Sequence, residues 1–88
     1  MWDWDEDKRT GNLAKHGVDF ATIVAFEWDT ALTAEDDRRD YGERRLVSVG
    51  FIGERLHVLV WTDRDEAPRL ISLRKANARE VKWYAGQI

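Results

Sequence analysis

The stretch LVSVGFIGERLHVLVWT, residues 46–62, decides the fold class. Apolar, β-branched and aromatic residues alternate through it with a period of two, which is typical of strands. Gly53-Glu54 in its middle is a two-residue hairpin signal. We therefore expect antiparallel strands over 46–52 and 56–62. A third strand is expected over 69–73, after a polar connection that holds the single proline, Pro68.

Helical signals lie before this strand-rich half. Asp3 or Asp5 is expected to cap a helix with an acidic first turn, and the helix should end at His16, before Gly17 in the left-handed cap position. Asp19 is expected to cap a short second helix. The apolar residues that recur at helical spacing after it are Phe20, Ile23 and Val24, with Phe26 and Ala21 as further candidates.

The remaining segments predict one weak strand and one more helix. Residues 30–33 are expected to form a short strand, and the acidic run 35–40 a solvated loop. Asn77 lies three residues before Glu80, which approximates a capping box, so a final helix should run from there to Gly86. The expected fold class is α+β, with two N-terminal helices, an antiparallel sheet of three to four strands and a C-terminal helix.

Composition indicates one small cytoplasmic domain. With 88 residues the chain has material for a single core, so we expect one domain over 1–88. The absence of cysteine excludes disulfides, thiol catalysis and cysteine zinc sites. At 43% hydrophobic and 35% charged residues, the chain suits neither disorder nor a membrane span.

The net charge of -3 hides an uneven distribution. Residues 1–43 carry 12 acids and 5 bases, whereas residues 44–88 carry 5 acids and 9 bases. The first half therefore has a charge of -7 and the second a charge of +4. Such asymmetry points to a nucleic-acid or charged-protein partner.

Metal chemistry is not supported by the residue spacing. His16 and His57 lie far apart in the sequence, and the acidic runs lack the alternation and central glycine of a calcium loop. A glycine-rich phosphate loop between a strand and a helix is also missing from the sequence. We expect no metal and no cofactor.

Titratable and basic residues near the N-terminus could transfer protons or bind phosphate. His16 titrates near neutral pH, and the helix end beside it should favour the protonated imidazole. The alternative is that His16 only caps the last carbonyls. Lys8 and Lys15 lie two turns apart on one helix face, either at a site or as a solvated stripe.

The C-terminal basic residues form the denser signal: Arg64, Arg69, Arg74, Lys75, Arg79 and Lys82. Guanidinium groups bind phosphate bidentately and stay charged, so a convergent set would stabilise a phosphoryl transition state. Ideal alternation puts Arg69 and Arg74 on opposite faces, and convergence therefore needs a twist, a bulge or a strand end. The alternative is solvated arginines paired with nearby acids.

Glu80 and Tyr84, four residues apart on the last helix, share a face. Near the arginines, either could assist proton transfer. Alternatively, Glu80 completes the cap and Tyr84 packs in the core beside Val81 with its hydroxyl outward. His57 is interpreted as structural or interfacial. Core or partner contacts are expected for Trp28, Trp61 and Trp83.

Three stretches together resemble a known family. Residues 4–20, WDEDKRTGNLAKHGVDF, are similar to the W-D-x-x-K-x-x-x-N-x-x-K-H-G-V-x-F signature of BrnT toxins. Residues 42–45, GERR, resemble the family's G-E-x-R. Residues 60–64, VWTDR, and 69–76, RLISLRKA, resemble its R-x-I-S-A-R-x-A segment, and a helix with Glu and Tyr follows. The departures are Trp2 for Phe, Leu73 for Ala, and the acidic run 35–40.

The resemblance implies a toxin of a type II toxin–antitoxin pair with a RelE-like fold that cuts RNA and slows growth. It also implies a BrnA-like antitoxin, with operator DNA bound only through the complex. Our leading hypothesis is metal-independent cleavage, in which the 2′-hydroxyl attacks the adjacent phosphate. The catalytic candidates are Lys8, Lys15, His16, Arg64, Arg74, Glu80 and Tyr84. The candidates for RNA binding are Arg69, Lys75, Arg79 and Lys82.

Two other functions remain open from the sequence. A non-enzymatic module could bind an acidic protein segment or DNA through its basic half. A DNA-binding antitoxin is disfavoured, because no helix-turn-helix or ribbon-helix-helix pattern is visible.

Overall fold

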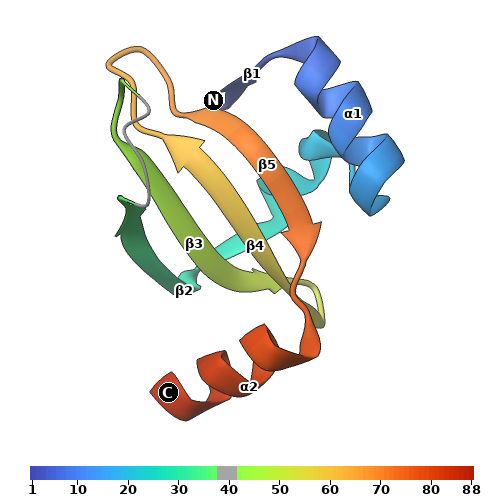
Figure 1. Ribbon diagram of the computed structural model, residues 1–88, viewed down its shortest axis with the longest axis vertical. Helices are drawn as coiled ribbons and strands as arrows, with labels where there is room; N and C mark the ends of the chain where they lie inside the picture. The colour runs from blue at the N-terminus through green and yellow to red at the C-terminus, as the bar shows by residue number, and fades with distance from the viewer. Residues whose placement is uncertain (38–41) are drawn as a thin grey trace.

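The hairpin over residues 46–62 forms the middle of the sheet (Figure 1). In the computed structural model, which describes residues 1–37 and 42–88, β3 (Arg45–Ile52) pairs antiparallel with β4 (Arg55–Thr62). Gly53 turns the chain between them with a φ of 61°, a left-handed conformation that glycine adopts without steric cost. β5 (Arg69–Lys75) pairs antiparallel with β4, so all three predicted strands are confirmed.

Across the described residues the sheet has five strands rather than three to four, in the order β1-β5-β4-β3-β2. β1 (Asp3–Trp4) pairs parallel with β5, and β2 (Phe26–Asp36) pairs antiparallel with β3 at the opposite edge. β2 includes the short strand expected over 30–33. It also includes Glu35 and Asp36, which were expected in a loop. Residues 38–40 of that expected loop lie outside the described residues.

The first and last helices form as predicted. α1 (Glu6–His16) begins after Asp5, whose side chain accepts two backbone hydrogen bonds of the first turn. α2 (Ala78–Gln87) begins after Asn77, and Asn77 and Glu80 complete the capping box in both directions. These ends are set by local hydrogen bonds, which is why the sequence predicts them well.

The expected second N-terminal helix is not an α-helix. Asp19 caps the 3-10 helix η1 (Phe20–Ala25), and Phe26 already belongs to β2. Phe20, Ile23 and Phe26 are all buried in one core. Their spacing of three matches a 3-10 helix, which has three residues per turn and stacks positions i and i+3.

Each face of the sheet has its own core. The first core receives side chains from η1, β4 and β5, and its largest fully buried members are Phe20, Ile23, Leu59, Leu70 and Leu73. The second receives Tyr84 of α2 and lies on the other face, because its Val58 is the strand neighbour of Leu59. No described helix is long and apolar enough to cross a bilayer.

β5 contains a bulge that changes which side chains share a face. Trp61 pairs with Leu70, but Val60 pairs with Ser72, so Ile71 is an extra residue. The bulge shifts the alternation by one position. Arg69 and Arg74 therefore lie on the same face of the sheet, the face that α2 partly covers.

Candidate active site

Arg74 and Glu80 form a bidentate ion pair where β5 gives way to α2. Arg74 Nη1 and Nη2 lie 2.7 and 2.8 Å from Glu80 Oε1 and Oε2. The Glu80 amide donates to Asn77 Oδ1 at 2.8 Å, and the Asn77 amide donates to Glu80 Oε1 at 2.9 Å. The hydrogen bonds of the pair raise the pKa of Arg74 and lower the pKa of Glu80. Both groups therefore stay charged at neutral pH.

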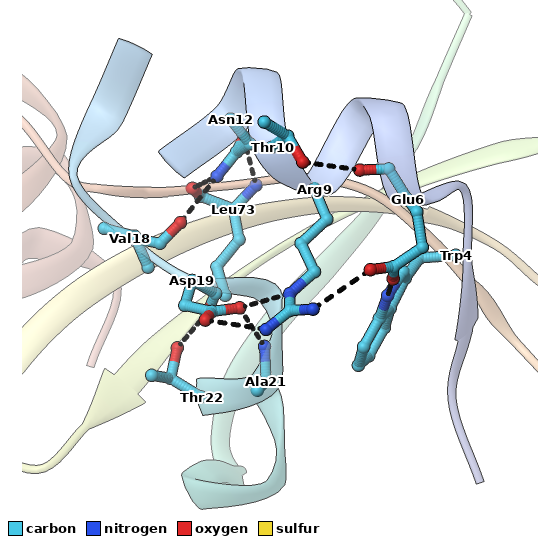
Figure 2. A network of polar contacts seen from close by, with 10 residues as sticks. All are labelled: Trp4, Glu6, Arg9, Thr10, Asn12, Val18, Asp19, Ala21, Thr22 and Leu73. Carbon is cyan, nitrogen blue, oxygen red and sulfur yellow. Dashed lines mark hydrogen bonds and ion pairs between the residues drawn. The ribbon is translucent and has the colours of Figure 1, made fainter. Parts of the chain in front are cut away.

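Asn12, one turn before His16, attaches α1 to the edge of β5 (Figure 2). Its Nδ2 donates to the carbonyls of Leu73 at 2.6 Å and Val18 at 3.1 Å, and its Oδ1 accepts from the Leu73 amide at 3.2 Å. The two-residue β1 stops short of this position, so the Asn12 amide satisfies the backbone groups that a longer strand would have paired. The end of α1 is thereby fixed beside the end of β5.

A second network ties α1 to η1 (Figure 2). Arg9 Nε and Nη2 lie 2.8 and 3.0 Å from the Asp19 carboxylate oxygens, and Arg9 Nη1 lies 3.0 Å from Glu6 Oε1. The hydrogen bonds from Arg9 lower the pKa of Asp19 to about 2. The cap of η1 is therefore also a contact to α1, which orients the helix that carries His16.

His16 is half-buried at the end of α1. Desolvation, followed by the positive charges of Lys15 and Arg74, lowers the pKa of its imidazole. The expectation that the helix end favours the protonated form is therefore wrong, because burial and two cations outweigh the helix dipole. His16 lies one turn after Asn12, whose side chain bonds the Leu73 backbone, so α1 ends beside the strand residue that precedes Arg74. Within the described residues, the imidazole makes no hydrogen bond.

Four further basic side chains surround this end of β5, and all are exposed. They are Lys15 on α1, Lys75 at the end of β5, and Arg79 and Lys82 on α2. Glu80 is the acid placed among them. The N-terminal and C-terminal basic residues predicted to share a site therefore lie on the two helices that adjoin this end of β5, α1 through Asn12 and α2 through the Arg74–Glu80 pair.

Other predicted residues lie away from this end of the sheet. Arg69 opens β5 and bonds Asp3 at 2.5 Å, while Arg64 in the preceding connection bonds Glu43 at 3.1 Å. At about 3.3 Å per residue, roughly 15 Å of strand separates Arg69 from Arg74. Figure 1 shows β5 running from β1 toward α2. The structure thus does not bring Arg64 together with Arg74.

Lys8 also lies toward the far end of its element. Eight residues separate Lys8 from His16, which is roughly 12 Å along an α-helix at about 1.5 Å per residue. Its helix begins next to β1, at the end of the sheet that holds Arg69. Of the N-terminal candidates, Lys15 and His16 are therefore the two at the end of α1 that Asn12 holds beside β5.

The acidic end of β2 is distant from Arg74. Asp36 pairs with Arg45 at the start of β3, and this end of the sheet also holds Thr62 and Arg69. Glu35 pairs with Arg44 at 3.3 Å. The described acids of the 35–40 run therefore lie at the same end of the sheet as Arg69, three strands away from it, and not at the end that holds Arg74.

Tyr84 and His57 are buried, each 5% exposed. The Tyr84 hydroxyl donates to the Thr30 carbonyl, and its ring packs edge-on against Phe51 with centroids 5.7 Å apart. Tyr84 therefore attaches α2 to β2, and its hydroxyl points inward rather than outward. Val81, expected beside it in the core, is 45% exposed. Desolvation lowers the pKa of His57, whose Nδ1 lies 2.8 Å from the Arg55 carbonyl.

Two features of this region were not predicted from the sequence. The first is the anchoring role of Asn12. The only signal in the sequence was an asparagine within the helix that carries His16, and its burial is known only from the structure. The second is a groove of about 410 Å³ beside the ion pair, bounded by Arg74, Arg79, Glu80 and Trp83. Trp83 is 49% exposed, and neither the residues around it nor its position in the helix marks it in the sequence as the wall of a groove.

No described residues form a cluster of three or more metal-ligating histidine or carboxylate side chains. The chemistry of this region comes instead from one imidazole, one paired guanidinium and several ammonium or guanidinium groups. This set suits a phosphodiester, because the cations can offset phosphate charge and the imidazole can accept a proton.

Comparison with protein families agrees with these observations. A family model described as "Ribonuclease toxin, BrnT, of type II toxin-antitoxin system" matches residues 4–80 of the 88. The matched range contains His16, Arg74 and Glu80, and it stops before Tyr84. No curated protein matches the sequence. The chain belongs to the BrnT family of ribonuclease toxins of type II toxin–antitoxin systems.

Proposed function

We propose that the chain is a metal-independent endoribonuclease whose active site is the His16–Arg74–Glu80 cluster. The observation that carries this proposal is that the end of α1, with the His16 imidazole, lies beside the end of β5, with the fixed Arg74 guanidinium. Asn12 and the capping box hold them there from two different helices. Proton transfer and charge stabilisation are the two requirements for phosphodiester cleavage by the RNA's own 2′-hydroxyl.

In the proposed reaction, His16 accepts the proton of the 2′-hydroxyl, and the 2′-oxygen attacks the adjacent phosphorus. The bond to the 5′-oxygen breaks, and that oxygen takes a proton from the Lys15 ammonium or from water. The products are a 2′,3′-cyclic phosphate and a 5′-hydroxyl. The lowered pKa of His16 supports the role of base, because it leaves the imidazole neutral at pH 7.

Arg74 is proposed to offset the charge that develops on the phosphate oxygens. A guanidinium has five N–H donors, so it can keep one contact to Glu80 while it binds phosphate. Glu80 acts as a positioning residue rather than as an acid, because its lowered pKa keeps it ionised. Tyr84 is assigned to the attachment of α2, since its hydroxyl already donates to the Thr30 carbonyl.

The remaining basic residues are proposed to bind RNA on both sides of the cleaved bond. Lys75, Arg79 and Lys82 lie nearest to Arg74. The more distant cations would contact phosphates further along the strand, and they are Lys8, Arg64 and Arg69. A cognate BrnA-like antitoxin would neutralise the toxin in the cytoplasm, and the pair would bind operator DNA as a complex.

Purified protein incubated with RNA in EDTA tests this proposal. Wild type should cleave, whereas Arg74→Ala and His16→Gln should lose cleavage by about a hundredfold or more. Arg64→Ala serves as the matched arginine control and should only weaken binding. If RNA stays intact while salt-sensitive binding remains, the protein is a binding module and the proposal fails. Full cleavage by Arg74→Ala would remove the phosphate clamp from the mechanism.

A further inference from the structure

An apolar groove continues from the proposed cleavage site along the face of the sheet. Its floor consists of four valines from the two central strands: Val47, Val49, Val58 and Val60. Arg74, Arg79 and Glu80 stand at one side, and the Trp83 indole forms a wall. The groove is therefore charged at its rim and apolar along its floor.

Trp83 also borders a second hollow of about 300 Å³, which continues over β2 and β3 and shares Val47 and Val49 with the first. The indole thus borders two apolar hollows that share lining residues, and it remains half-exposed. Two other side chains attach α2 to the sheet: Tyr84 through the Thr30 carbonyl and Glu80 through its ion pair with Arg74. A large aromatic ring therefore borders the valine floor while about half of it stays open to solvent.

The position of Trp83 relative to the cations is set by helix geometry. Glu80 lies three residues and Arg79 four residues before Trp83, so the three side chains share one helix face. Because Glu80 holds Arg74, the indole is about one turn of helix from the proposed phosphate clamp. A nucleotide whose phosphate is bound at Arg74 could therefore extend its base toward the indole.

The size and charge of the groove favour a base over a docked protein. A volume of about 410 Å³ lies in the range of small-ligand pockets, roughly 300–1,000 Å³. A stable protein interface buries about 800 Å² on each partner, and an uncharged protein segment would gain nothing from the cations at the rim. Flat apolar surfaces beside basic side chains are typical of single-strand binding sites, where bases stack on aromatic rings.

We propose that Trp83 is a stacking platform for a nucleobase of the RNA substrate, next to the nucleotide whose phosphate contacts Arg74. This inference rests on the proposed ribonuclease function, because it takes the phosphate position from Arg74. The valine floor has no hydrogen-bonding side chain, so the subsite holds a base by its ring face. It therefore selects by stacking strength rather than by hydrogen bonds to base edges, and its sequence preference is modest.

The test uses a short 2′-O-methyl RNA oligonucleotide, which lacks the attacking hydroxyl and stays intact. Its affinity is measured for wild type, Trp83→Ala and Val81→Ala. Val81 is the matched control, because it lies on the same helix, is 45% exposed and does not border the groove. The same measurements are made with an abasic version of the oligonucleotide, which keeps the phosphates and lacks the bases.

Trp83→Ala should bind the full oligonucleotide about 5- to 100-fold more weakly than wild type. The two proteins should bind the abasic version equally, and Val81→Ala should match wild type throughout. Unchanged affinity in Trp83→Ala, or an equal loss with both oligonucleotides, would overturn the stacking role. Loss of antitoxin binding with unchanged RNA affinity would make the groove a protein-docking surface and also overturn it.

Failure of this inference and failure of the proposed function can be told apart. If Arg74→Ala and His16→Gln abolish cleavage while Trp83→Ala binds both oligonucleotides as wild type does, only the stacking subsite is wrong. If wild type does not cleave RNA in EDTA, the proposed function is wrong whatever the affinities show.

Discussion

Replacing Asn12 by alanine should detach the end of α1 from β5. The side chain is 8% exposed and makes three hydrogen bonds, two to carbonyls and one from an amide. A typical hydrogen bond contributes about 1 kcal/mol, and a buried polar group left unpaired costs about 1–3 kcal/mol. We therefore expect Asn12→Ala to lower the free energy of unfolding by about 2–4 kcal/mol. For a domain of this size the melting temperature would fall by roughly 10–30 °C.

Urea unfolding followed by circular dichroism measures this loss, and Thr10→Ala is the control on the same helix. Thr10 is exposed, and its hydroxyl donates only to the Glu6 carbonyl. Thr10→Ala should therefore change the free energy of unfolding by no more than about 0.5 kcal/mol. Asn12→Asp keeps the shape but replaces the NH2 group by a carboxylate oxygen, which cannot donate to the Val18 and Leu73 carbonyls. This variant should lose at least as much stability as Asn12→Ala. RNA cleavage by Asn12→Ala should fall further than the folded fraction, because His16 loses its position. If Asn12→Ala lowers the free energy of unfolding by less than about 1 kcal/mol, the anchoring role of Asn12 is refuted.

Three further predictions concern residues around the site. Because its guanidinium partner lowers the pKa of Glu80, the carboxylate stabilises the fold above pH 4.5 and loses this effect as the pH falls through the lowered value. Glu80→Gln should therefore be less stable than wild type at pH 7, and urea unfolding should show the difference shrinking below pH 4.5; a constant difference would contradict this. Tyr84→Phe leaves the Thr30 carbonyl unpaired and should cost about 1–2 kcal/mol in urea unfolding. Cleavage per folded molecule should stay unchanged, so lost activity in a folded variant would return Tyr84 to the catalytic set. Gly50→Ala would bring a Cβ within 2.7 Å of the Phe26 ring and should cost about 1–3 kcal/mol, whereas unchanged thermal stability would show that the ring moves freely.

The elements that the sequence predicts correctly are those set by nearby residues. The Asp5 cap, the Gly53 turn and the Asn77–Glu80 box each join residues within a few positions of one another. β2 was largely missed because its partners in β3 are 9 to 26 residues away in the sequence and its side chains do not alternate cleanly between buried and exposed. Its place in the sheet depends on pairing with β3, which its own residues do not reveal.

The candidate site was predictable in its residue types and less so in its geometry. His16 and Arg74 could be chosen because imidazole and guanidinium are suited to phosphodiester chemistry. Their meeting depends on Asn12, which contacts Leu73 some sixty residues later in the chain, and no local pattern shows such a contact. The sequence predicted the wrong direction for the pKa shift of His16, because burial of the imidazole depends on the whole fold and outweighs the effect of the helix end.

The chemical ends of the RNA products test the central claim most directly. Wild-type protein is incubated with a defined RNA in EDTA, and the fragments are identified by mass spectrometry. Attack by the 2′-hydroxyl predicts a 2′,3′-cyclic phosphate on one fragment and a 5′-hydroxyl on the other, with no cut where the preceding sugar is 2′-deoxy. Fragments with a 3′-hydroxyl and a 5′-phosphate would show attack by water instead. That result would contradict the mechanism assigned to His16 and Arg74.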